Sequence, residues 1–290
     1  MEARVAVVTG GASGIGAALA AGLVMRGDIV TVADLDQQGA ERTAERLRAR
    51  GPGRAVGAGL DVRDVKAVIE LVQSVEDEHG RIDLMFNNVG IAVSGTAEEH
   101  TLDYWDRSIE VNLRGVVHGV HAVYPIMLRQ GFGHIVNTAS LAGLVPAPLM
   151  TAYSATKHAV VGLSLALRAE AVSRGVRVSV VCPGFIDTPL IDNVNPGLPK
   201  TAASNHARAS ALRVQRKLYA PDRLASDVLR GVDRNQALIV SPAFARLMWR
   251  IARLSPSLVL RIATFDLARF RTSCQHGADR DLGWHQSSPP

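Results

Sequence analysis

The chain has 290 residues and a mass of 30.9 kDa, and its 47% hydrophobic and 20% charged residues exclude disordered and fibrous classes. The two cysteines, Cys182 and Cys274, are too few for a disulfide framework and suit a reducing compartment. No apolar run approaches the ~20 residues that cross a bilayer, and no leader is evident, so we expect a soluble cytoplasmic protein, with peripheral membrane contact left open.

The net charge of +5 is unevenly distributed. Residues 201–290 carry 14 Arg and Lys against 6 Asp, a net +8, which leaves −3 for the first 200 residues. The arginines are spread out and no aromatic residues interleave with them in a stacking pattern. We therefore expect a solvated basic surface and no nucleic-acid partner.

Short apolar segments alternate with longer amphipathic segments along the chain. The segments predicted as strands are Val5–Val8, Ile29–Ala33, Arg54–Gly59, Leu84–Asn87, His134–Thr138, Arg177–Val181 and Ala237–Val240. Those predicted as helices are Gly14–Arg26, Gln38–Arg50, Val65–His79, Leu102–Arg129, Ala152–Ser173 and Asp222–Arg234. This alternation predicts an α/β fold: a Rossmann-type doubly wound parallel sheet in one domain, residues 1–240, with ligands at the carboxyl ends of the strands.

Two later regions depart from the alternation. Asp187–Ala211 lacks clear periodicity and is interpreted as a mobile flap over the site. Residues 241–277 predict extra C-terminal helices, with Ser255-Pro256 starting the second, and residues 278–290 predict a loose tail. We favour plain packing of these helices on the core or on a neighbouring subunit. Two alternative roles of these helices stay open: an apolar lid over a hydrophobic substrate, and a membrane contact through their arginine-flanked face.

A glycine-rich loop follows the first predicted strand and opens the first helix. It places Gly10, Gly14 and Gly16 where the backbone must turn sharply and approach a pyrophosphate at the helix N-terminus. The second strand ends at Asp34, just over 20 residues further on, where a carboxylate accepts hydrogen bonds from the adenosine ribose. Because this carboxylate repels a 2′-phosphate, we predict NAD as the cofactor, with NADP less favoured.

Tyr153 and Lys157 lie four residues apart on one face of a predicted helix. A free tyrosine has a pKa near 10, and a cation within reach can lower that pKa by ~1–3 units. Tyr153 would then exchange a proton with a substrate oxygen while a hydride moves to or from carbon. Ser140 lies 13 residues earlier, just past a strand end, where α/β sheets bind ligands.

Together, the glycine spacing and the Ser140, Tyr153 and Lys157 set resemble the short-chain dehydrogenase/reductase family from about Val5 to Pro189. The resemblance implies that Ser140 hydrogen-bonds the substrate oxygen and that Asn112 holds a water in a proton relay. It also implies that a dinucleotide contacts further residues besides the glycine loop and Asp34. The full set of expected cofactor-binding residues is Gly10, Ser13, Gly14, Ile15, Gly16, Asp34, Asp61, Val62, Asn88, Gly90, Tyr153, Lys157, Ile186 and Thr188. Within that set, Asp61-Val62 lies beside the adenine, and Ile186 and Thr188 contact the carboxamide.

The predicted function is an NAD-dependent oxidoreductase acting on a secondary alcohol or ketone, with the apolar C-terminus favouring a steroid-, retinoid- or lipid-like substrate. The alternatives are a catalytically silent nucleotide-binding regulator and a membrane-docked, lipid-modifying reductase that uses NADP. The resemblance implies a homodimer or homotetramer built on the Leu102–Arg129 and Ala152–Ser173 helices. No metal is expected, because His118 and His121 lack a third ligand and are interpreted as helix-surface or interface residues.

Overall fold

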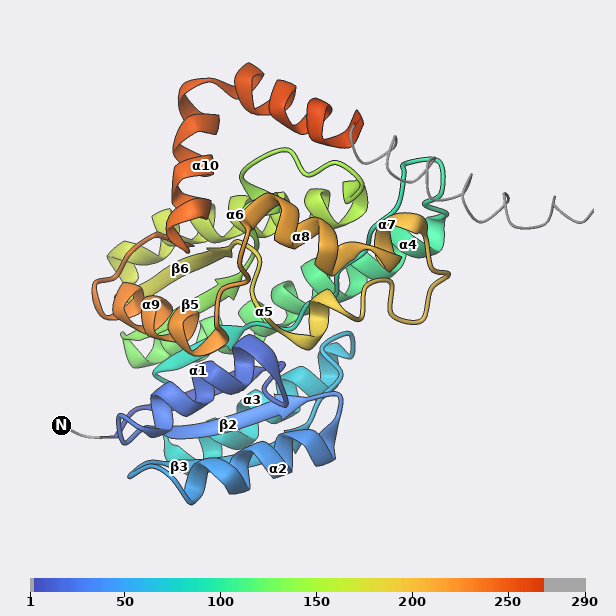
Figure 1. Cartoon of the computed structure of the whole chain (residues 1–290). Coiled ribbons are helices and arrows are strands. Elements are labelled where there is room, and N and C mark those ends of the chain that lie inside the picture. The colour runs from blue at the N-terminus through green and yellow to red at the C-terminus, as the bar shows by residue number, and fades with distance from the viewer. Residues whose placement is uncertain (1–2, 269–290) are drawn as a thin grey trace, which may run out of the picture.

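The computed structural model describes residues 3–268, in which seven parallel strands form one sheet in the order β3-β2-β1-β4-β5-β6-β7 (Figure 1). The strands are β1 (Val5–Thr9), β2 (Ile29–Asp34), β3 (Arg54–Gly59), β4 (Leu84–Asn87), β5 (Gly133–Thr138), β6 (Val176–Pro183) and β7 (Leu238–Ser241). Strand order reverses between β1 and β4, so a ligand crevice is expected at their carboxyl ends. The predicted Rossmann-type α/β fold is confirmed.

Helices cover both faces of the sheet (Figure 1). One face carries α1 (Gly14–Val24), α2 (Gln37–Arg48) and α9 (Pro221–Asp233). The other carries α3 (Val65–His79), α5 (Gly115–Gln130) and α6 (Thr151–Ala171). Burial on both faces explains why most strands appear in the sequence as continuous apolar runs without alternation.

The helix predicted over Leu102–Arg129 is interrupted in the structure. It consists of α4 (Leu102–Ser108), a π-helical turn, η1 (Ile109–Arg114), and α5. The inserted turn contains Asn112, whose side chain is fully buried. A π-helical turn shifts the register of the following residues without breaking the apolar pattern, so periodicity does not reveal it.

The segment Asp187–Ala211, interpreted from the sequence as a mobile flap, contains helices that the sequence did not predict, and its mobility stays a prediction. The segment contains the short 3₁₀ helix η4 (Pro189–Ile191) and α7 (Ala202–Asn205), and α8 (Ala207–Gln215) begins within it. A capping box between Thr201 and Ser204 starts α7. These helices are too short and too polar to show a periodic apolar face.

The C-terminal region is helical, as expected for the extension. α10 spans Ala243–Leu254, and residues 256–268 are helical after Ser255. Two further 3₁₀ turns, η2 (Leu141–Gly143) and η3 (Val172–Arg174), flank α6. The end of the predicted extension at 277 and the predicted tail, residues 278–290, lie outside the described residues, and the division at residue 240 stays a prediction.

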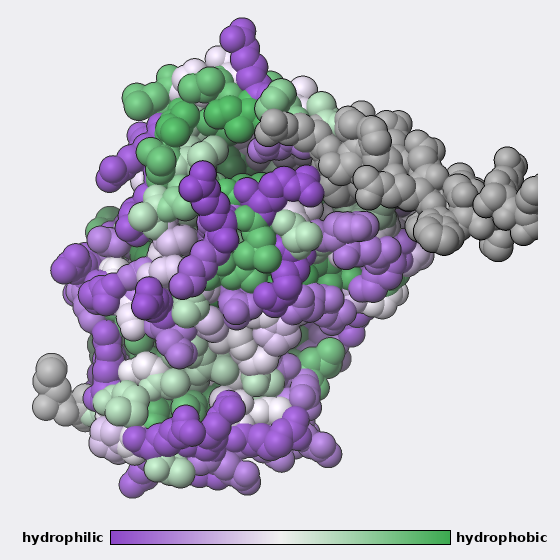
Figure 2. Space-filling view, in the orientation of Figure 1, coloured by the Kyte–Doolittle hydropathy of each residue, from purple (hydrophilic) through white to green (hydrophobic). Residues whose placement is uncertain are grey.

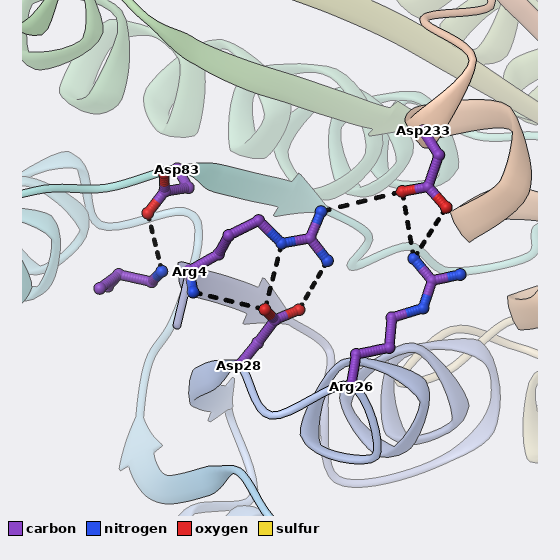
Figure 3. A network of polar contacts seen from close by, with 6 residues as sticks. Arg4, Arg26, Asp28, Asp83 and Asp233 are labelled. Atoms are coloured by element: carbon purple, nitrogen blue, oxygen red, sulfur yellow. Dashed lines mark hydrogen bonds and ion pairs between the residues drawn. The ribbon is translucent and has the colours of Figure 1, made fainter. Parts of the chain in front are cut away.

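A polar network ties together the amino ends of three strands (Figure 3). Arg4 donates to both carboxylate oxygens of Asp28, at 3.1 and 2.7 Å, and its Nη1 lies 3.8 Å from Asp233. Asp83 accepts the backbone N–H of Val5 at 2.8 Å. The network lies at the end of the sheet opposite the predicted ligand crevice, so it stabilises the fold and leaves the crevice to other residues.

Candidate active site

The loop between β1 and α1 has the geometry that glycine permits. Gly10 and Gly14 adopt positive φ values of 69° and 54°. A Cβ on Gly16 would lie 2.0 Å from the carbonyl oxygen of Gly10, so only glycine fits there. Ser13 is the N-cap of α1, yet its side chain makes no capping hydrogen bond. The first N–H groups of α1 are therefore not capped by that side chain, and the cradle fits a pyrophosphate.

Asp34 lies at the end of β2, facing this loop. Its carboxylate accepts the backbone N–H of Ala12 at 3.0 Å and that of Asp36 at 3.0 Å. The side chain of the next residue, Leu35, is exposed and supplies no cation. The arrangement fixes a negative charge beside the glycine loop.

The Asp61-Val62 segment after β3 is held by two neighbours that the sequence did not indicate. Arg63 makes hydrogen bonds of 3.0 and 2.5 Å with the carboxylate of Asp61, and this guanidinium holds the pKa of Asp61 below its ordinary value. The Nδ1–H of His118 donates to the carbonyl oxygen of Val62 at 2.8 Å. His118 is buried, so its interpretation as a surface or interface histidine was wrong.

The segment after β4 joins the loop to the centre of the site. The side-chain amide of Asn88 donates to the carbonyl oxygen of Thr9 at 3.1 Å, and its oxygen accepts the hydroxyl of Thr138 at 3.3 Å. A Cβ on Gly90 would lie 3.2 Å from both Asn112 Oδ1 and Lys157 Nζ. A small residue at Gly90 therefore lets the backbone approach both groups.

Asn112 is bound to the backbone of that same segment. Its Oδ1 accepts the N–H of Ile91 at 2.8 Å, and its Nδ2 donates to the carbonyl oxygen of Ile91 at 3.0 Å. A longer contact of 3.5 Å reaches the hydroxyl of Thr156. The structure thus shows Asn112 as a clamp on the backbone beside Gly90, and the water relay stays a prediction.

Ser140, Tyr153 and Lys157 come together beside the carboxyl end of β5. Lys157 is 2% exposed; its Nζ donates to the carbonyl oxygen of Thr138 at 3.0 Å and lies 5.6 Å from the centroid of the Tyr153 ring. Burial lowers the pKa of Lys157 to about 8. The Thr138 carbonyl was not foreseen as its partner, because backbone acceptors leave no mark in a sequence.

The pKa of Tyr153 differs from the expectation. Burial of its phenol raises the pKa above the ordinary value, and the hydrogen bond with the Ser140 hydroxyl opposes that shift. The expected lowering by the Lys157 cation does not dominate in the protein alone. The physical reason is that desolvation penalises the phenolate more than these neighbours stabilise it.

The segment after β6 closes the other side of the glycine loop. A Cβ on Gly14 would lie 3.1 Å from Cγ2 of Thr188, so this threonine packs against the loop. Ile186 is buried in the same apolar cluster as α1 and α9. A contact between Ile186 and a carboxamide would therefore come from its backbone. Cys182, at the end of β6, is a buried thiol whose pKa burial raises to about 12.

The side chains and helices of residues 3–268 bear on two other kinds of site. Within that range, no cluster of three or more His, Cys, Asp or Glu side chains has the arrangement to hold a metal ion. None of the helices described there is both long and apolar enough to cross a bilayer.

Comparison with known proteins agrees with this geometry. A family model described as short chain dehydrogenase matches residues 4–199. The putative oxidoreductase SadH of Mycobacterium tuberculosis is 33% identical over 273 residues, which cover 93% of this chain and 97% of the relative. D-threitol dehydrogenase of Mycolicibacterium smegmatis is 41% identical over 191 residues, covering 66% and 73%. A solved short-chain dehydrogenase/reductase from Burkholderia phymatum, in complex with NAD, matches with a TM-score of 0.79 and 31% identity over 89% of this chain and 95% of that one.

Proposed function

The chain belongs to the short-chain dehydrogenase/reductase family of oxidoreductases, and on that premise we propose that it transfers a hydride between NAD and a secondary alcohol or ketone. One observation carries the proposal: a buried lysine ammonium, a tyrosine phenol and a serine hydroxyl meet beside the carboxyl end of β5. A buried, charged lysine is costly unless it serves a partner. The partner proposed here is the phenolate of Tyr153.

Each side chain of this set has a distinct part in the proposed reaction. In alcohol oxidation the Tyr153 oxygen takes the hydroxyl proton, and in carbonyl reduction it returns one. The Ser140 hydroxyl donates a hydrogen bond to the substrate oxygen, where negative charge develops. The Lys157 ammonium stabilises the phenolate. When bound, NAD supplies the acceptor or donor of the hydride and, in its oxidised form, a positive charge.

The proposed dinucleotide site follows the edge of the sheet from the adenine end to the nicotinamide end. The pyrophosphate would bind the uncapped start of α1, where Gly16 lets the helix pack closely against the Gly10 carbonyl of the loop. Asp34 would accept hydrogen bonds from the adenosine ribose, and Val62 would contact the adenine. Thr188, packed against the glycine loop, would contact the nicotinamide end.

The preference for NAD rests on the Asp34 carboxylate. Replacing Asp34 with Ala removes both a hydrogen-bond acceptor for the ribose and a charge that repels a 2′-phosphate. We expect the ratio of kcat/KM with NAD to kcat/KM with NADP to fall by roughly ten- to a hundredfold, the equivalent of one hydrogen bond to a charged group. Steady-state kinetics with both cofactors measure this ratio. An unchanged ratio would contradict the assignment.

An apolar substrate is favoured by the residues around Ser140. The segment that follows Ser140 contains Leu141 and Val145, which belong to one apolar cluster with residues of α10. Figure 2 also shows apolar residues, in green, in the recess below the C-terminal helices. The test is a panel of secondary alcohols with NAD, in which formation of the reduced cofactor is followed by absorbance. We expect higher kcat/KM for steroid- or fatty-chain alcohols than for polyols such as D-threitol; the reverse order would contradict the substrate class.

A catalytically silent nucleotide-binding regulator would need the dinucleotide contacts but no group that exchanges a proton with a substrate. It would give no reason for the Tyr153 phenol to lie with both the Ser140 hydroxyl and the Lys157 ammonium. We therefore propose an enzyme. Turnover of any alcohol in the panel, lost in Tyr153→Phe, separates the two functions.

We also propose that the chain forms a homodimer or homotetramer through α5 and α6. A hollow of about 280 Å³ lies on these two helices, with an apolar wall that includes Val117, Val120 and Leu163. Val117 and Leu165 are exposed on the same two helices. Light scattering of the purified protein tests the proposal, and a monomer at micromolar concentration would contradict it.

A further inference from the structure

Two helical segments at the C-terminal side of the described chain expose large apolar side chains. These segments are α10 and residues 256–268, which Figure 1 shows at the outer edge of the molecule, beyond the sheet. Leu254 is 87% exposed, Leu247 and Leu260 are each 56% exposed, and Leu258 is 47% exposed. We name these four leucines, with Ile262, the C-terminal apolar surface.

The exposure is concentrated on the outward side of each helix. In residues 256–268, only Val259, Ala263 and Leu267 are buried or half-buried, and their spacing of four residues puts them on one side, toward the body. Leu258 and Ile262, four residues apart, lie along the flank of that row and are 47% and 40% exposed. A helix of a soluble protein normally carries polar residues at positions this exposed.

The two helices that carry the C-terminal apolar surface are packed against the core of the protein. Ala245 of α10 and Val259 of the following helix are buried in one cluster with Leu141 and Val161. Figure 2 shows green residues gathered over these two helices at the top of the view. A contiguous apolar patch held in a fixed position is the usual mark of an interaction site.

Positive charges predominate around this surface. Arg246, Arg250, Arg253 and Arg261 lie on the same two helices, against a single carboxylate, Asp266. The exposed stripe of α10 alternates these arginines with Leu247 and Leu254. Arg253 also stacks on the ring of Trp249 at 5.4 Å, where a rigid aromatic supports the cation.

From this combination we infer that the C-terminal apolar surface docks the protein on the face of an anionic lipid bilayer. Exposed leucines enter the boundary between headgroups and acyl chains, and the flanking arginines pair with lipid phosphates. A second copy fits less well, because a symmetric interface would bring four arginines of one chain onto the same four of the other. The inference does not depend on the cofactor or substrate assigned above.

Co-sedimentation of the full chain with vesicles tests the inference. We expect binding to vesicles of phosphatidylcholine with phosphatidylglycerol and at least tenfold weaker binding to phosphatidylcholine alone. The variant Leu247→Ser/Leu254→Ser/Leu258→Ser should reduce binding to the anionic vesicles at least tenfold. The variant Arg250→Glu/Arg261→Glu should do the same and remove the salt dependence.

Matched controls change equally exposed residues elsewhere. Met25→Ser/Leu102→Ser/Val172→Ser replaces three exposed apolar side chains, and Arg50→Glu/Arg174→Glu reverses two exposed charges without altering the C-terminal helices. Both controls should bind vesicles as the natural chain does. Failure of the natural chain to bind anionic vesicles would overturn the inference, as would equal losses in the controls. So would loss of a dimer, detected by light scattering, in the leucine variant without any change in vesicle binding.

Discussion

At the scale of single residues, burial sets the charge of two neighbours in the site, Lys157 and Tyr153. Lys157 has a pKa of about 8 and is mostly charged at neutral pH, while burial raises the pKa of Tyr153. The phenolate therefore needs the Lys157 cation, and the positive charge of oxidised NAD, to form near neutral pH.

Replacing Lys157 with Met tests this dependence. The substitution removes the cation, so the pKa of Tyr153 rises and the ascending limb of kcat/KM for alcohol oxidation moves upward by about 1 to 3 pH units. A pH–rate profile of both proteins measures the displacement. Thr156→Ser, one position away on α6, serves as the control and should leave the profile in place. A Lys157→Met profile that coincides with the natural one would contradict the role of the cation.

The sequence identified the residues of the site better than their contacts. Spacing, the glycine loop upstream and the family resemblance together indicated Ser140, Tyr153 and Lys157, because the chemistry needs those side-chain types on one helix face and one strand end. The sequence did not indicate that the Thr138 carbonyl holds Lys157 or that His118 holds Val62. These partners are backbone atoms brought together by the fold, and they belong to no side-chain pattern.

At the scale of elements, steric contact explains why the glycine loop tolerates so little change. A Cβ at Gly16 would meet the Gly10 carbonyl oxygen at 2.0 Å, and that backbone atom cannot move aside without opening the loop. Gly162 in the exposed part of α6 has no atom within 4 Å of an added Cβ. Replacement with alanine should therefore cause a steric clash at Gly16 and none at Gly162.

We expect Gly16→Ala to weaken NADH binding by at least about tenfold, equal to ~1.4 kcal/mol. Gly162→Ala should leave NADH binding unchanged and raise the free energy of unfolding by ~0.5–1 kcal/mol, because alanine is the better helix former. Fluorescence titration with NADH and urea unfolding provide the two measurements. Equal NADH affinity in both variants would show that the loop does not bind the pyrophosphate.

Element boundaries were predictable where the apolar pattern was strong. The predicted strands Arg54–Gly59 and Leu84–Asn87 and the helix Val65–His79 coincide with the structure. The π-helical turn Ile109–Arg114 and the short helices α7 and α8 were missed. The π-helical turn contains Asn112, whose clamp on Ile91 is a tertiary contact, and α7 and α8 are too short and too polar to show a periodic apolar face.

At the scale of the whole molecule, alternation and right-handed crossovers predict a parallel sheet with helices on both faces, which is why the fold class was predictable. The buried polar residues of the sheet could not be predicted in this way. His134, at the amino end of β5, is buried with its Nε2 2.8 Å from the Ser179 hydroxyl. That hydroxyl donates to the Gln236 carbonyl, so the imidazole is the donor to Ser179.

The imidazole of His134 makes stability depend on pH. Burial, with the nearby charges of Arg177, Arg168 and Arg4, lowers its pKa from 6.5 to about 3. The unfolded chain therefore binds a proton that the folded protein does not, so stability is fully present above pH ~6.5 and is lost as the pH falls toward 3. From this residue, the free energy of unfolding should fall by about 1.4 kcal/mol per pH unit in that range.

Replacing His134 with Gln keeps an N–H donor for Ser179 and removes the titration. Urea unfolding between pH 7 and pH 4 should show a shallower loss of stability in His134→Gln than in the natural chain. The control is His206→Gln, because the imidazole of His206 is exposed. Its free energy of unfolding should depend on pH as that of the natural chain does. Parallel curves for His134→Gln and the natural chain would contradict the burial argument.

In the proposed reaction, the Tyr153 oxygen carries the proton while a hydride moves to or from the bound dinucleotide. The most direct measurement compares Tyr153→Phe with the natural chain, for kcat with the best alcohol of the panel and for NADH affinity by fluorescence. We predict that kcat falls by about 100- to 10,000-fold, the usual worth of a general acid or base, while NADH affinity stays the same. Full turnover by Tyr153→Phe would contradict the account.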